Sequence, residues 1–102
     1  MKTIRRISEE AAFEMAEREI GSGQVADWPV LWKEEWDATE AAVCLKATKD
    51  GYFLGASCDT QDAFELFVCE ERAPIEELGQ RFVAEMKASG NPLSGAVEID
   101  AQ

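Results

Sequence analysis

Residues 42–58, AVCLKATKDGYFLGASC, consist of two apolar runs that flank Lys49-Asp50-Gly51. An Asp-Gly pair between apolar runs is the strongest short sequence signal for a β-hairpin, because both residues tolerate the positive φ of a tight turn. We therefore expect two antiparallel strands, 42–48 and 52–58. A helix capped by Thr39 is the alternative for the first of them.

Outward from the hairpin, the N-terminal part predicts an amphipathic helix of about a dozen residues. Ser8 is a good N-cap, and Gly21 stands where a helix C-terminus favours glycine. The apolar residues that recur at helical spacing and should face the core are Ala12, Phe13, Ala16 and Ile20. The carboxylates that should form its outer face are Glu10, Glu14 and Glu17.

A second helix is predicted from Pro74 to Ser89, ending at Gly90. Its core stripe consists of Ile75, Leu78, Phe82 and Met86. Gly79 lies beside this stripe, where its missing side chain would let another part of the chain approach closely. Residues 96–99 alternate well enough to predict a short final strand.

Two segments are harder to assign. Trp28, Trp32 and Trp36 recur every four residues, which favours a helix over 28–36 with all three rings on one face. A twisted extended segment would also bring alternate residues to one side. Residues 59–72 combine a capping signal and a polar stripe with an alternating pattern, and we favour a helix there over a third strand.

Together these elements predict an α+β fold: a small antiparallel sheet, centred on the hairpin near Asp50-Gly51, packed with two to four helices in a single domain spanning 1–102. The chain is 46% hydrophobic, which supplies enough apolar material for a core despite 30% charged residues. We expect a cytoplasmic protein, because three cysteines form no paired framework and acidic residues interrupt any leader-like start.

The charge restricts the partners. There are 21 Asp and Glu against 10 Lys and Arg, a net charge of −11. Direct binding to nucleic acid or to an anionic membrane requires clustered cations, so we expect neither. Histidine is absent, which removes the commonest general base and the commonest metal ligand. We therefore expect no catalytic residue, no metal site and no cofactor, and we interpret Cys44, Cys58 and Cys69 as packing residues.

The leading hypothesis is a non-enzymatic protein-binding module, an inhibitor or adaptor that docks on a basic, possibly nucleic-acid-binding, surface of a partner protein. In size and charge the chain is similar to small acidic proteins that block nucleases, toxins or defence complexes, phage-encoded and immunity-type inhibitors among them. The expected contacts are Glu10, Glu14, Glu17, Trp32, Glu34, Glu35, Trp36 and Asp37. The alternatives are a small-ligand-binding or enzymatic domain, and a structural subunit of a larger assembly; the oligomeric state is left open.

Overall fold

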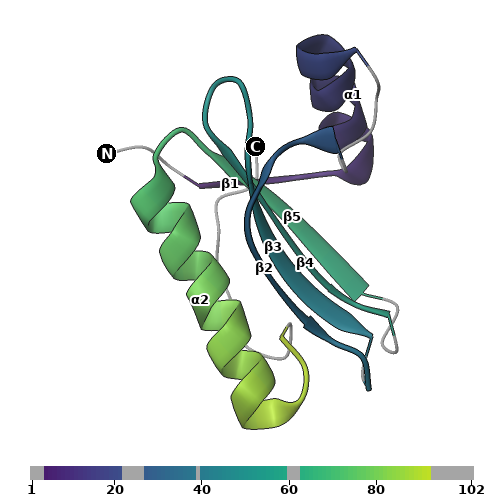
Figure 1. Cartoon of the computed structure of the whole chain (residues 1–102), viewed down its shortest axis with the longest axis vertical. Helices are drawn as coiled ribbons and strands as arrows, with labels where there is room; N and C mark the ends of the chain where they lie inside the picture. The colour runs from purple at the N-terminus through teal and green to yellow at the C-terminus, as the bar shows by residue number, and fades with distance from the viewer. Residues whose placement is uncertain (1–3, 22–26, 39, 60–62, 93–102) are drawn as a thin grey trace.

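The computed structural model describes residues 4–21, 27–38, 40–59 and 63–92, which build one antiparallel sheet and two helices (Figure 1). The elements are β1 (Arg5–Ile7), α1 (Glu9–Ile20), β2 (Val30–Trp36), β3 (Ala41–Ala47), β4 (Tyr52–Cys58), β5 (Ala63–Cys69) and α2 (Arg72–Ser89). The strand order is β1-β5-β4-β3-β2, and every neighbouring pair is antiparallel. The α+β prediction is confirmed. The strand predicted over residues 96–99 lies outside the described residues.

The hairpin at the centre of the sheet is confirmed. β3 and β4 pair along their whole length, with Leu45 opposite Leu54, and the Thr48 N–H donates to the Gly51 carbonyl across the turn. Gly51 is also held by its surroundings, since a Cβ there would lie 2.5 Å from the Cys69 carbonyl oxygen. Neither Asp50 nor Gly51 has a positive φ, so the turn glycine serves the close approach of β5 rather than a left-handed turn conformation.

The helix predicted over 28–36 is wrong, because residues 30–36 form strand β2. A spacing of four residues fits a strand as well as a helix, since four is a multiple of the two-residue strand repeat. A β-bulge shifts the register between Val30 and Trp32, and one extra residue reverses the faces before and after it. Trp32 and Trp36 consequently lie on the α2 side of the sheet, whereas Trp28 packs on the other side.

The helix favoured over 59–72 is also wrong, because residues 63–69 form strand β5. β5 pairs with β4 along its length and with β1 near its end, so it lies inside the sheet. A strand inside the sheet is covered on both faces, and the apolar residues of this stretch suit that position. The polar residues at helical spacing were therefore the misleading signal. Phe67, on one face, is fully buried, while Val68, on the other, is only 5% exposed.

The main core lies between the sheet and α2 (Figure 1). The buried residues that form it are Val43, Leu45, Leu54, Ala56, Phe67, Cys69, Ile75, Leu78, Phe82 and Val83. Phe67 and Phe82 stack at a centroid distance of 5.7 Å. The predicted core stripe of α2 is confirmed, and so is its end, where Gly90 adopts a left-handed φ of 80°.

A smaller cluster lies on the opposite face, where α1 covers part of the sheet. It contains Ala12, Ala16, Trp28, Phe53 and Val68. The predicted helix ends are confirmed: the Ser8 hydroxyl accepts from the Ala11 N–H at 3.1 Å, and Gly21 has a left-handed φ of 71°. The predicted stripe is only half right, because Phe13 is 46% exposed and Ile20 is 40% exposed. The stripe therefore reaches the sheet through its two alanines.

Candidate functional site

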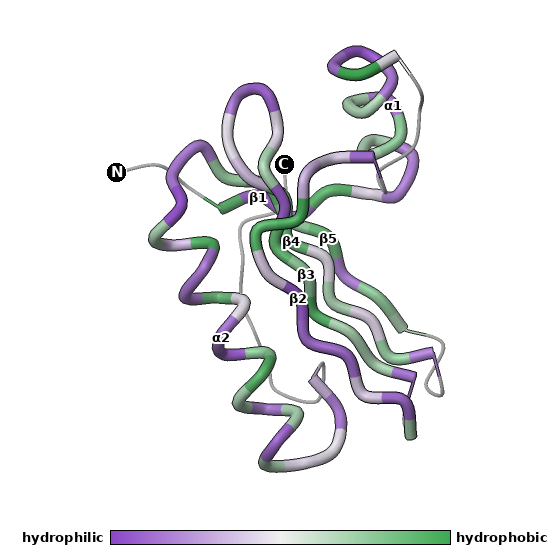
Figure 2. Tube along the Cα trace, in the orientation of Figure 1, coloured by the Kyte–Doolittle hydropathy of each residue, from purple (hydrophilic) through white to green (hydrophobic). Residues whose placement is uncertain are grey.

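Strand β2 forms one edge of the sheet, since it pairs with β3 and no described strand lies beyond it. Lys33, Glu34 and Glu35 are all exposed, and Figure 2 shows a hydrophilic stretch of β2 beside the more hydrophobic inner strands. Sheet edges carry backbone donors and acceptors without a strand partner, which makes them natural attachment points for another chain.

The direction of the β2 backbone groups follows from the hydrogen bonds of its neighbours. The Asp59 N–H donates to the Glu40 carbonyl, so the even-numbered residues of β3 bond to β4, and its odd-numbered residues bond to β2. Trp32, Glu34 and Trp36 stand opposite these odd-numbered residues. The N–H and C=O groups of Lys33 and Glu35 therefore point away from β3, toward the free edge.

The side chains of β2 divide between the two faces of the sheet. Glu34 shares the α2 side with Trp32 and Trp36, while Lys33 and Glu35 share the other side. Lys33 Nζ lies 3.0 Å from Glu35 Oε1. This contact raises the pKa of the Lys33 ammonium, through the hydrogen bond and the attraction of the Glu35 charge. Glu34 thus projects from the α2 side of the sheet and Glu35 from the other side, where Lys33 already contacts it.

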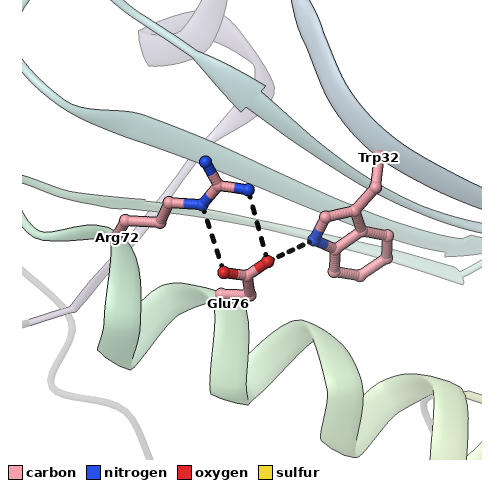
Figure 3. Close-up of polar contacts among 3 residues, drawn as sticks. All are labelled: Trp32, Arg72 and Glu76. Atoms are coloured by element: carbon pink, nitrogen blue, oxygen red, sulfur yellow. Dashed lines mark hydrogen bonds and ion pairs between the residues drawn. The ribbon is translucent and has the colours of Figure 1, made fainter.

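Trp32 is tied to α2 by a polar contact (Figure 3). Its Nε1–H donates to Glu76 Oε2 at 3.1 Å, and the same carboxylate accepts from Arg72 Nε at 3.1 Å. The ring edge covers Gly79 so closely that a Cβ there would lie 2.8 Å from Trp32 Cζ2. The predicted close approach at Gly79 is confirmed, and Trp32 is held by its own chain.

Trp36, like Trp32, is half-buried, and it packs against a small cluster of Ala41, Cys58 and Met86. It also lines a hollow of about 440 Å³ beside the turn between β2 and β3. Within the described residues, its indole N–H makes no hydrogen bond that could hold it as Glu76 holds Trp32. Of the two tryptophans proposed as anchors, Trp36 has the freer side chain.

The hollow beside Trp36 is acidic. Among the residues described, its lining includes four carboxylates and neither Lys nor Arg. These four residues are all exposed, and they are Glu35, Asp37, Glu40 and Asp59. Glu40 and Asp59 were missing from the predicted contacts, because only the antiparallel pairing of β3 with β4 brings Asp59 opposite Glu40. We call Glu34 together with these four residues the acidic edge.

The predicted contacts fall on two elements. Trp32, Trp36 and the carboxylates between and after them come together on β2 and its following turn. The other three lie on α1 and are exposed, as expected for its outer face: Glu10, Glu14 and Glu17. The structure gathers the β2 residues around the acidic edge, and it carries the α1 carboxylates on a separate element (Figure 1).

A further hollow, about 650 Å³, lies between α1 and the β3–β4 turn. Its lining includes three cations, Arg5, Arg18 and Lys49, and an equal number of carboxylates, Glu19, Asp50 and Glu70. Glu19 connects α1 to the β3–β4 turn, because its carboxylate accepts from the Lys49 backbone N–H at 2.6 Å. The same oxygen accepts from the Trp28 indole N–H at 3.1 Å. Sequence spacing gave no sign of this cluster, because its members lie far apart along the chain.

No group of three or more potential metal-ligating side chains occurs among the described residues. None of the three cysteines forms a disulfide in the described part of the chain; Cys58 and Cys69 are buried and Cys44 is half-buried. Burial raises the pKa of the Cys44 thiol, and the nearby Lys46 and Lys33 oppose that effect. A raised pKa makes the thiolate scarcer, which is the reverse of what a catalytic cysteine requires.

Comparison with known proteins finds no match for this chain among protein-family models, curated proteins or solved structures. Neither helix in the described part of the chain is long and apolar enough to cross a membrane.

Proposed function

We propose that this chain is a small acidic protein-binding module without enzymatic activity, an inhibitor or adaptor that docks on a basic surface of a partner protein. The observation that carries the proposal is the acidic edge, where carboxylates from β2, its following turn and the end of β4 surround one hollow beside Trp36. Opposite charge on the partner would speed association and select against acidic competitors.

The exposure of these carboxylates favours binding over acid–base catalysis. A general acid and base need carboxyl groups held in distinct environments across a substrate cleft. Glu35, Asp37, Glu40 and Asp59 instead lie at an open rim. Such a rim suits the Lys and Arg side chains of a protein surface, including one that otherwise holds DNA or RNA.

The experiment is an affinity capture from the native host with the full chain as bait, repeated at rising salt. Replacing Glu34, Glu35 and Asp37 together by Lys should weaken binding to the captured partner by more than about tenfold, as expected from roughly 0.5 kcal/mol per reversed charge. The matched control reverses Glu70, Glu71 and Glu77, which change the net charge equally at another place. Reversal of Glu10, Glu14 and Glu17 tests the α1 surface in the same way.

The result that would overturn the proposal is binding that is insensitive both to salt and to every one of these triple reversals. Equal losses for the edge and control triples would also count against it, because net charge alone would then explain the affinity.

A second candidate function is small-ligand binding in the 650 Å³ hollow between α1 and the β3–β4 turn, whose lining carries three cations and three carboxylates. Two of the cations, Arg5 and Arg18, make no ion pair with any described residue and could bind an anionic group of the ligand. A melting-temperature rise with a panel of carboxylates and phosphates, lost in Arg18→Ala, would support this candidate. No shift with any member of the panel would eliminate it.

A further inference from the structure

We propose that the free edge of β2 accepts an extended segment of a basic partner protein as a sixth strand of the sheet. Two successive Lys or Arg residues of that segment would reach Glu34 on one face and Glu35 on the other. The inference rests on the proposed function and specifies how the partner docks.

The backbone supplies the first part of the argument. Lys33 and Glu35 direct their N–H and C=O groups away from β3, as derived above from the bonds of Asp59 and Glu40. Lys33 and Glu35 are two residues apart, and in an antiparallel pair every second residue of a strand forms hydrogen bonds with the same neighbouring strand. In the part of the chain that the structure describes, no strand pairs with this side of β2. The edge is therefore a ready template for one more strand.

The side chains supply the second part. Glu34 projects on the α2 side, and Glu35 projects on the opposite side. Consecutive residues of an added strand also project to opposite faces, so two adjacent basic residues meet the two carboxylates at once. Directly opposed residues of neighbouring strands lie about 4.5–5.5 Å apart at Cβ, within reach of an ion pair. The remaining carboxylates of the acidic edge extend the same charge beyond Trp36.

Charge also argues against a second copy of this chain as the occupant. Antiparallel self-pairing centred on Glu34 would place that carboxylate directly opposite its own copy, which is unfavourable. The two Lys33–Glu35 pairs formed across such an interface would only replace the 3.0 Å pair that already exists within each chain. Each copy also brings a net charge of −11. A basic segment removes the first and the third difficulty, because it places a cation opposite Glu34 and brings positive charge to an acidic chain. At Glu35 it shares a carboxylate that Lys33 already contacts.

Charged residues at a sheet edge commonly serve to prevent pairing. The test must therefore detect strand addition itself. The probe is the capped peptide Thr-Val-Arg-Arg-Val-Thr, added to the full chain labelled with ¹⁵N, and the readout is amide hydrogen exchange by NMR. We expect exchange at Lys33 and Glu35 to slow by at least about tenfold at saturation. The amides of Glu34 and Trp36, which already face β3, should change little and act as the internal control.

Two sets of variants complete the test. A peptide with the same side chains but N-methyl groups on alternate amides should lose binding, because it lacks the donors for the edge. Glu34→Lys with Glu35→Lys should weaken binding of the parent peptide by about tenfold, whereas Glu71→Lys with Glu77→Lys, which changes the charge equally elsewhere, should weaken it less than threefold.

The inference is overturned if the peptide binds without protecting Lys33 and Glu35, or if the N-methylated peptide binds as well as the parent. Docking on the acidic edge by side chains alone would then remain, so the proposed function would survive. Protection of the same two amides that rises with protein concentration, in the absence of peptide, would identify a second copy as the occupant and would also overturn it. Absence of salt-sensitive binding to any basic partner would instead remove the proposed function.

Discussion

The indole N–H of Trp32 on β2 donates a 3.1 Å hydrogen bond to the carboxylate of Glu76 on α2. This contact connects the edge strand directly to the helix that covers the sheet, and Arg72 holds the same carboxylate from one turn earlier (Figure 3). Strand β2 is therefore held to α2 by the Trp32–Glu76 hydrogen bond and by the contact of the Trp32 ring with Gly79, while Lys33, Glu34 and Glu35 stay exposed.

Loss of this hydrogen bond should destabilise the fold measurably. We expect Trp32→Phe, which removes the donor, to lower the free energy of unfolding by about 1 kcal/mol. A double-mutant cycle with Glu76→Ala, measured by urea denaturation, should give a coupling energy of about 1 kcal/mol. The control cycle pairs Trp36→Phe with Glu76→Ala and should give none. Equal coupling in the two cycles would contradict the assignment.

Gly79→Ala should be destabilising even though it improves helix propensity. The propensity gain is about 1 kcal/mol. The added Cβ would lie 2.8 Å from Trp32 Cζ2 and 3.1 Å from Leu54 Cδ1, and overpacking of this kind costs about 1 to 3 kcal/mol. We expect a net loss of about 1 kcal/mol in urea denaturation. Gln80→Ala on the exposed face is the control, and a rise in the denaturation midpoint of Gly79→Ala would refute the close contact.

Ser8→Ala should weaken α1. The Ser8 hydroxyl accepts from the Ala11 N–H at 3.1 Å, and loss of such a cap costs about 1 kcal/mol. Ser8→Asp retains an acceptor and adds a negative charge at the helix N-terminus, so it should keep the stability of the parent. Thermal unfolding followed by circular dichroism compares the three proteins. A loss in Ser8→Asp as large as in Ser8→Ala would show that the cap is not the cause.

The Cys44 thiol should react slowly despite its partial exposure. Burial raises its pKa, so the reactive thiolate is scarcer at a given pH than in the unfolded chain. Because the folded state then retains the proton to higher pH than the unfolded state, stability should fall as the pH rises from the unfolded-state pKa toward the folded-state pKa. Labelling with a disulfide reagent at pH 8, with and without denaturant, checks the first point. Comparison with Cys44→Ser identifies the labelling phase that belongs to Cys44, and equal rates for this thiol in the folded and unfolded chains would contradict the prediction.

Local signals were sufficient for several elements. Ser8 and Gly21 delimit α1, Asp50-Gly51 marks the central turn, and Gly90 ends α2, because caps and turns depend on the conformational preferences of a few adjacent residues. The prediction of exposed carboxylates on α1 was also correct for Glu10, Glu14 and Glu17. Their role in binding stays a prediction.

The acidic α+β composition, the central hairpin and the helix that follows it could be predicted from the amino-acid pattern alone. The assignment of residues 30–36 and 63–69 to strands required the packed sheet, because a four-residue repeat and a run buried on both faces fit either conformation until their neighbours are in place. The acidic edge likewise depends on tertiary packing. Glu35 and Asp59 lie far apart along the chain, and the hydrogen-bonded register of β2, β3 and β4 is what brings them to one hollow.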